Sequence, residues 1–475
     1  MPNQTSPERG KTVEELRLDE ARKSGVSWKQ WGPYLSERQW GTVREDYSEN
    51  GDAWNYFTHD QARSRAYHWG EDGHAGFSDD HQRLCFALAV WNGKDPILKE
   101  RLFGLTNSKG NHGEDIKEYY FYLDSTPIHS YMKYLYKYPQ NAYPYGGLVA
   151  TNRGHGRNDW EYELLDTGIF NDDRYFDVFV EYAKASPTDI LIQISIANRG
   201  REAAKLHVLP TLWFRNTWTW WPDQPKPSLR QKPGENTVTI EASYAELGAF
   251  LLHCDGNPQL LFTENDTNNE RIFGTPQPVA LRQGRDQQLC RGGQAGSRQP
   301  RQIGTKAAAH YQLNVGAGET AVIRRRLSDA ALGDPFGGRF DQITEDRRRE
   351  ADAFYQAIIP TCISEDEARV MRQALAGMFW SKQYFLYVHR QVARGTRLRC
   401  DAADAPSGAQ PRVVPHDRRA CHLDAGQVGI SLVCRLGSRL SHPSPGDRRY
   451  RFRQTAARPA APPSLPPSDG ANPSL

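Results

Sequence analysis

The sequence predicts a large antiparallel β-sandwich that is followed by helices. From about residue 80, short runs rich in aromatic and β-branched residues recur between Gly, Pro, Asn and Asp. Long segments with a helical spacing of apolar residues come only after residue 335. Strands at this density, without long helices between them, are typical of an antiparallel sandwich. We therefore expect a mainly β domain first and a helical domain second.

The first element expected along the chain is a short helix in an N-terminal arm, residues 1–27. Thr12 stands three residues before Glu15, and these two side chains can form a capping box that begins a helix. The polar residues before them contain no apolar core of a signal peptide.

The strands are expected in seven runs between residues 83 and 256, and they are followed by a pair of strands near residue 317. The seven runs read RLCFALAVW, EYYFYLDS, YFDVFVEYA, DILIQISIA, KLHVLPTLWF, TVTIEASY and AFLLHCDG. The later pair, AAAHYQLNV and ETAVIRRRL, is separated by glycines at 316 and 318, which predicts a β-hairpin.

Two helices are expected after the strands. The segment from residue 338 has helical spacing and ends at Pro360, and Ser364 with Glu367 forms a second capping box. The helix that this box begins carries an apolar stripe at intervals of three and four residues, which is suited to packing on other helices. The stripe consists of Val370, Met371, Ala374, Leu375, Met378 and Phe379.

Composition excludes several classes of function. The net charge of +3 is small and its basic excess lies in arginines after residue 390, so we expect no nucleic-acid partner. No apolar run approaches the roughly 20 residues that cross a bilayer, so we expect no membrane partner and a cytoplasmic location. The seven cysteines are scattered without a CxxC pair, which indicates reduced thiols rather than a zinc site.

Four motifs resemble one enzyme family over residues 28–387. They read ERQWGTVREDYS, RSRAYHWGEDG, ERLFGLTNSKGNHGED and MRQALAGMFWSKQ. This stretch resembles the bacterial glucosidase-like proteins of glycoside hydrolase family 63, relatives of mannosyl-oligosaccharide glucosidase. The resemblance implies a β-supersandwich over residues 28–335 and the first helices of an (α/α)6 barrel over residues 338–390. It also implies inverting hydrolysis of α-glucosidic linkages in oligosaccharides, without a cofactor.

The catalytic segment that the resemblance implies is missing. Inverting hydrolysis needs an acid and a base roughly 6.5 to 9.5 Å apart, and the family carries the acid in a segment like PWFAAWDLAFH, which does not occur here. Residues 422–453 can be encoded by codons that spell this segment when they are read one base later. We therefore predict a frameshift near residue 391, a disordered out-of-frame tail over residues 391–475, an incomplete barrel and no catalytic residue.

A second segment of the sequence also resembles the family when its codons are read in the shifted frame. Residues 281–292 can be read one base later as YVKDGINNYVV, which is again similar to the family. We predict that residues 278–303 are locally out of frame. The rival interpretation of the whole chain is a non-catalytic carbohydrate-binding or scaffold protein that uses the sandwich alone.

The predicted substrate-binding residues combine tryptophan, which stacks on sugar faces, with charged groups, which bind hydroxyls. They are Trp40, Arg44, Glu45, Asp46, Trp69, Glu71 and Asp72. The alternative is an interdomain contact surface. The neighbouring His68, Glu71, Asp72 and His74 lack the fixed spacing of a zinc motif, so we expect a polar loop and no metal.

A tryptophan cluster near residue 217 also has two interpretations. Trp213, Trp218, Trp220 and Trp221 can line a carbohydrate groove, or they can fill the core of a sandwich that is short of aliphatic residues. The sequence favours the second interpretation.

Overall fold

The computed structural model describes most of the first 384 residues. The described residues are 10–35, 64–68, 70, 72–101, 118–156, 158–219, 224–233, 237–275, 302–382 and 384. The chain divides into two units, Met1–Val433 and Cys434–Leu475, and every described residue belongs to the first unit. The predicted out-of-frame tail, residues 391–475, and nearly all of the patch at 278–303 lie outside the described residues.

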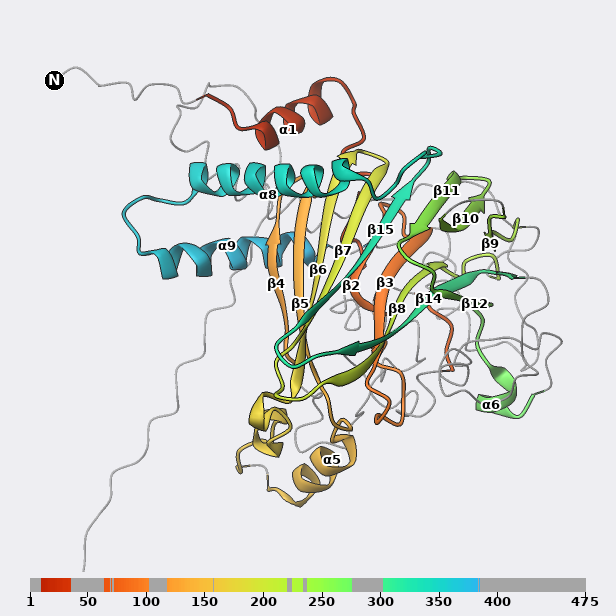
Figure 1. Ribbon diagram of the computed structural model, residues 1–475, viewed down its shortest axis with the longest axis vertical. Helices are drawn as coiled ribbons and strands as arrows, with labels where there is room; N and C mark the ends of the chain where they lie inside the picture. The colour runs from red at the N-terminus through yellow and green to blue at the C-terminus, as the bar shows by residue number, and fades with distance from the viewer. Residues whose placement is uncertain are drawn as a thin grey trace, which may run out of the picture. The chain divides into compact units, whose positions relative to one another are not determined.

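Two antiparallel sheets form the centre of the described part (Figure 1). In order across it, the first sheet contains β1 (Trp31–Gly32), β2 (His74–Asp79), β3 (Leu84–Trp91), β8 (Ala204–Phe214), β14 (Lys306–Val315) and β12 (Gln259–Thr263). The second contains β13 (Ile303–Gly304), β9 (Ser228–Gln231), β10 (Val238–Tyr244), β11 (Gly248–Cys254), β15 (Thr320–Ser328), β7 (Asp189–Asn198), β6 (Tyr175–Ser186), β5 (Tyr131–Pro139) and β4 (Tyr120–Ser125). The expected mainly β domain is therefore present.

The main hydrophobic core lies between the two sheets. Alternate residues of β3 and β8 in one sheet, such as Phe86 and Leu212, join alternate residues of β6 and β7 in the other, such as Val180 and Ile194. This alternation follows from the two-residue period of side chains along a strand. Much of the filling is aromatic, as the low aliphatic content predicts, and Trp213 is buried in a smaller core cluster as expected.

The predicted hairpin around residue 317 is wrong. β14 pairs with β8 and β12, whereas β15 pairs with β7 and β11, so the turn carries the chain from one sheet to the other. Asn198, at the end of β7, holds this turn: its carbonyl oxygen accepts from the Gly318 N–H at 3.1 Å, and its side-chain amide donates to the Val315 carbonyl at 2.9 Å. Glycine marks the turn correctly, since Gly318 has a φ of +70°, but it does not specify which strands pair.

Three helices gather at one end of β6 (Figure 1). They are α1 (Val13–Lys23), α8 (Gly338–Ile358) and α9 (Glu365–Trp380). Both predicted capping boxes are confirmed, at Thr12 and at Ser364. α8 packs on β6 and on α1, while α9 packs on β4. No further barrel helix is present among the described residues.

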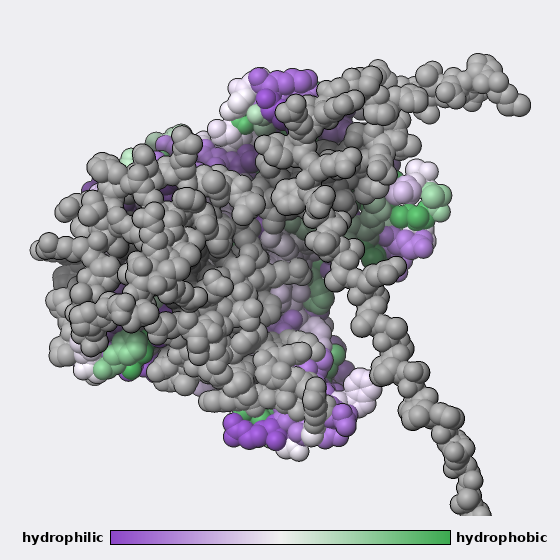
Figure 2. Space-filling view, turned by 180° about the vertical axis from the view of Figure 1, so that it is seen from behind, coloured by the Kyte–Doolittle hydropathy of each residue, from purple (hydrophilic) through white to green (hydrophobic). Residues whose placement is uncertain are grey.

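The predicted apolar stripe of α9 is only partly buried. Phe379 is buried with Ala376 and Trp380 near the end of the helix, and this end packs on a strand rather than on other helices. Val370 and Met378 are 63% and 44% exposed. Seen from behind, the tip of the α8–α9 pair shows hydrophobic residues beside hydrophilic ones (Figure 2).

A small lobe lies at the opposite end of β5 and β6 (Figure 1). It contains α5 (Tyr145–Gly154) and two short 3-10 helices, η3 (Leu164–Thr167) and η4 (Asn171–Asp173), packed around Leu148. A further short helix, α6 (Asn269–Phe273), follows β12. None of the described helices is long and apolar enough to cross a membrane.

Candidate functional site

Most of the predicted sugar-binding residues lie outside the described residues. This holds for Trp40, Arg44, Glu45, Asp46, Trp69 and Glu71. Asp72 is described, and it is fully buried just before β2, where its carboxylate forms an ion pair with the Nε of Arg101. The sugar-binding set therefore stays a prediction, and the contacts of Asp72 are those of a structural ion pair.

A layer of buried charges continues from Asp72. The Tyr67 hydroxyl donates to the Glu100 carboxylate, and Lys306 lies 3.8 Å from the same carboxylate and 4.3 Å from the Tyr67 ring centroid. Burial raises the pKa of Tyr67 well above its ordinary value, and the Glu100 charge raises it further. Tyr67 therefore acts as a hydrogen-bond donor at neutral pH.

A second buried ion pair joins Lys99 to Glu118. The Lys99 ammonium donates to Glu118 at 2.6 Å, and the Tyr136 hydroxyl donates to the other oxygen of that carboxylate at 2.5 Å. Burial raises the pKa of Glu118, and Lys99 partly offsets this shift. His74 stacks on Tyr136, and burial followed by the Lys99 charge lowers its pKa to about 3, so the imidazole is neutral. A neutral, hydrogen-bonded imidazole next to a lysine is a poor general acid at neutral pH.

A possible cation group follows β2. One ligand atom from each of Asp79, Asp80 and His81 lies within 4.8 Å of the others. However, the Asp79 carboxylate accepts from the backbone N–H groups of Arg83 and Leu84, at 2.6 and 2.9 Å. These contacts are those of a turn between two strands, and the Arg83 guanidinium at 3.3 Å from Asp79 opposes a cation.

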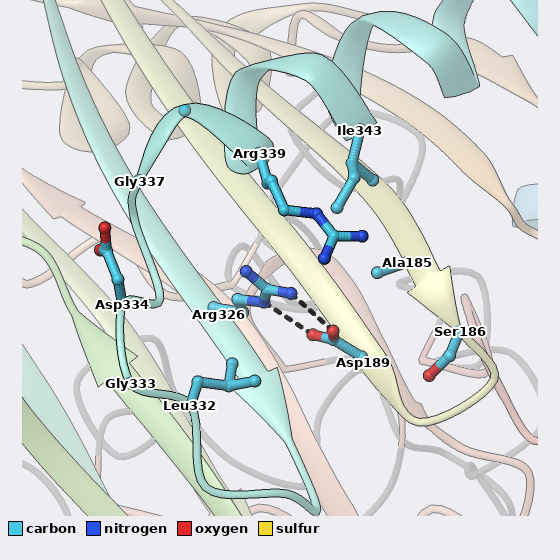
Figure 3. A pocket seen from close by; sticks show the side chains of 11 residues that line it. Ala185, Ser186, Asp189, Arg326, Leu332, Gly333, Asp334, Gly337, Arg339 and Ile343 are labelled. Atoms are coloured by element: carbon cyan, nitrogen blue, oxygen red, sulfur yellow. Dashed lines mark hydrogen bonds and ion pairs between the residues drawn. The ribbon is translucent and has the colours of Figure 1, made fainter.

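One pocket of about 500 Å³ opens where the sandwich meets α8 (Figure 3). It is bounded by the β6–β7 turn, by β15, by the loop that follows β15 and by the first two turns of α8. Its lining residues are Ala185, Ser186, Asp189, Arg326, Leu332, Gly333, Asp334, Gly337, Gly338, Arg339 and Ile343. The volume falls in the range of small-molecule sites.

The pocket is built around a bidentate ion pair. The Nε and Nη2 atoms of Arg326 lie 2.8 and 2.7 Å from the two carboxylate oxygens of Asp189, and Nη1 donates to the Pro335 carbonyl at 3.2 Å. This pair joins β15 to the start of β7 and fixes the loop above it. Sequence reasoning missed this site, because its residues come from four separate segments that no motif connects.

The comparisons with known proteins give one close relative in sequence. No family model matches the chain. The chain is 39% identical over 421 residues to an uncharacterized protein of Saccharomyces cerevisiae, YMR196W. The match covers 80% of this chain and 39% of the yeast protein, so the chain spans about two fifths of the length of that relative.

The similar solved structures are distant. One is a candidate kojibiose phosphorylase from the human microbiome, with 8% identity and a TM-score of 0.25, covering 63% of this chain and 28% of that one. Another is a polysaccharide lyase, with 13% identity and a TM-score of 0.26, covering 57% of this chain and 28% of that one. TM-scores this low do not establish a common fold.

Proposed function

We propose that this chain is part of a glycoside hydrolase similar to family 63, whose complete form performs inverting hydrolysis of α-glucosidic linkages in oligosaccharides. The observation that carries the proposal is the order of the domains, a β-sandwich followed directly by α8 and α9, in the chain whose motifs resemble that family. The relative in yeast is much longer than the matched region, which supports a longer complete form.

In this proposal the catalytic acid and base belong to an (α/α)6 barrel, and the 475-residue sequence in its present reading frame contains only the first helices of that barrel. The exposed residues Val370 and Met378 of α9 are the surface on which the next barrel helices would pack. A frameshift near residue 391 accounts for the missing acid segment. The sandwich contributes part of the sugar site through the predicted residues around the motifs at 37–48 and 63–73.

The direct test is the nucleotide sequence downstream of codon 391, followed by expression of two versions of the protein. We expect the written 475-residue chain to hydrolyse α-glucosides no faster than a buffer blank, because a positioned acid and base are absent. The restored-frame protein should release glucose. Measured glucose release from both, with a mock purification as control, checks the expectation.

Two results would overturn the proposal. Glucose release by the written chain above the mock purification would contradict the missing catalytic pair. If the restored-frame protein is soluble yet inactive on every α-glucoside tried, the hydrolase interpretation is wrong. The alternative, a non-catalytic carbohydrate-binding or scaffold protein, then replaces it.

A further inference from the structure

Three consecutive arginines of β15 lie in two different environments. Arg324 and Arg326 point to the outer face of the second sheet, and each pairs there with a carboxylate. Arg324 lies 2.9 Å from Asp255, and Arg326 holds both oxygens of Asp189. Side chains alternate between the two faces of a strand, so Arg325 points the other way, into the sandwich. Its side chain is 0% exposed.

The surroundings of Arg325 are apolar or neutral. Ile323 and Leu327, two positions before and after it on β15, belong to the main hydrophobic core. Its guanidinium carbon lies 4.4 Å from the ring centroid of Tyr311, which β14 contributes from the opposite sheet. Burial raises the pKa of Tyr311, and it also raises the pKa of Cys254, the residue opposite Arg325 on β11. Both neighbours are therefore uncharged at neutral pH.

The charge of Arg325 has no carboxylate partner among the described residues. Its Nη1 atom donates to the Arg324 carbonyl at 2.8 Å, whereas Nε and Nη2, both buried, make no hydrogen bond within the described part of the chain. The Asp255 carboxylate, which follows Cys254, is held by Arg324 and by the Gly256 N–H instead. Because an ion buried without a counter-charge is strongly destabilising, buried charges in folded proteins are paired.

The two unused nitrogens lie on one edge of the guanidinium. Nε and Nη2 are the same two atoms with which Arg326 holds the oxygens of Asp189, at 2.8 and 2.7 Å. Arg325 therefore presents to the interior of the sandwich the edge that its neighbour uses for a carboxylate. Protein cores contain few voids larger than a water molecule, so a partner at this edge has to be small.

We propose that Arg325 binds one small monovalent anion between the two sheets, through Nε and Nη2. The anion is a halide or a carboxylate of one carbon, and it supplies the counter-charge that the protein does not. The Tyr311 ring covers the guanidinium on the side of the first sheet. The bound anion stabilises the sandwich, and this role is separate from the proposed sugar site.

Urea denaturation of the purified 475-residue chain, followed by circular dichroism, tests the proposal at neutral pH and constant ionic strength. Sodium gluconate is replaced stepwise by sodium chloride or by sodium formate, which carries the carboxylate of gluconate without its bulky body. We expect chloride, formate or both to stabilise the chain relative to gluconate. The ratio of folded to unfolded chain should rise about tenfold for each tenfold rise in anion concentration above its Kd.

Two variants of Arg325 show whether the effect comes from this site. Arg325→Met removes the charge and should lose the response to both anions. In gluconate it should be at least as stable as the unchanged chain, because it no longer buries an unmatched charge. Arg325→Lys keeps the charge without the two-atom edge and should respond more weakly than the unchanged chain.

Arg230→Gln is the matched control, because Arg230 is an exposed arginine of the same sheet that pairs with Glu241. It should keep the full response. The proposal is wrong if neither anion stabilises the unchanged chain relative to gluconate, since the two nitrogens then bind only water. It is also wrong if Arg325→Met responds as strongly as Arg230→Gln. Should far-UV circular dichroism show that Arg325→Met does not fold, a full response of Arg325→Lys would contradict the proposal.

Discussion

α8 and α9 follow each other in the chain and both carry apolar faces, but their surroundings differ. α8 buries Phe340, Ala351, Phe354 and Tyr355, which are spread over most of its length. α9 buries Ala376, Phe379 and Trp380, which all lie in its last turns. The first helix is therefore covered along its whole length, and the second is covered at one end.

The polar contacts follow the same division. α8 is fixed at three places: Arg347 donates to the Lys184 carbonyl, Glu350 pairs with Arg17 of α1, and Tyr355 donates to the Ser125 carbonyl, each at 2.6 Å. The first half of α9 has no such contact with the sandwich among the described residues, and its anchors begin at Arg372. The comparison teaches that the sandwich and α1 together hold α8 along its length, whereas the described residues hold α9 only over its second half.

The largest expected effect comes from removing the anchor of α9. Trp380 is buried, stacks on Tyr122 with ring centroids 5.1 Å apart, and donates to the Asp124 carbonyl at 2.8 Å. Trp380→Ala should lower the free energy of unfolding by about 3–5 kcal/mol, because it leaves a cavity and an unpaired carbonyl. Urea denaturation followed by circular dichroism measures it.

Met378→Ala is the control on the same helix, since Met378 is 44% exposed. It should change the free energy of unfolding by no more than about 0.5 kcal/mol. If Trp380→Ala cost no more than Met378→Ala, the two ends of α9 would not differ as the structure indicates.

Lowering the pH should destabilise the contact between the end of α9 and the sandwich. The Nε2 atom of His129 lies 2.9 Å from the Lys382 ammonium, just after α9. Burial, followed by the charges of Lys382, Lys184 and Lys29, lowers the His129 pKa well below its ordinary value of 6.5. The unfolded chain then binds a proton below pH 6.5 that the folded chain does not. The His129 imidazole alone should therefore lower the free energy of unfolding by about 1.4 kcal/mol for each pH unit below 6.5, in addition to the contribution of His74.

His129→Asn should remove this part of the pH dependence. Asparagine suits the φ of +59° at this position, which lies in the left-handed region. Denaturation at pH 6.5, 5.5 and 4.5 compares the slopes. Equal slopes for His129→Asn and the unchanged chain would contradict the role of this imidazole.

Much of the fold could be predicted where local pattern and structure coincide. Both capping boxes, at Thr12 and Ser364, are local contacts between residues three apart, and both form. All seven predicted strand runs contain strands. β5 was missed because its lysines and tyrosines alternate without a clear apolar run, although the tyrosines Tyr134 and Tyr136 fill the core.

The pairing of the strands and the position of the candidate sites could not be predicted from local sequence patterns. The turn at Gly318 joins two sheets because Asn198, about 120 residues earlier, holds it, and no local pattern contains that information. The pocket depends on Arg326 meeting Asp189 across 137 positions. The predicted sugar-binding set rests on motif resemblance, and its one described member, Asp72, shows a structural ion pair.

The contact between α1 and α8 is expected to contribute less than the anchor of α9. Arg17 lies 2.6 Å from Glu350, whose carboxylate also pairs with Arg347 at 2.7 Å. Because Glu350 keeps this second partner, Arg17→Ala should cost only about 1–2 kcal/mol of unfolding free energy. Lys23→Ala, which removes an exposed pair with Asp19, should cost under about 0.5 kcal/mol. Equal losses would show that α1 does not stabilise α8.

The smallest effect on stability, and the sharpest test of the comparison, is expected on the exposed face of α9. Val370 and Met378 are the large apolar members of the predicted stripe that are exposed in the structure, and exposed apolar side chains on one helix face favour self-association. Val370→Glu combined with Met378→Glu should raise the monomer fraction in size-exclusion chromatography, while the free energy of unfolding changes by no more than about 0.5 kcal/mol. Leu165→Glu removes an equally exposed apolar residue from the lobe and should leave the monomer fraction unchanged. If the unchanged chain already elutes as a monomer, or if Leu165→Glu raises the monomer fraction as much as the double variant, the exposed face of α9 does not cause self-association. In that case α9 needs no further packing partner, as is true of α8.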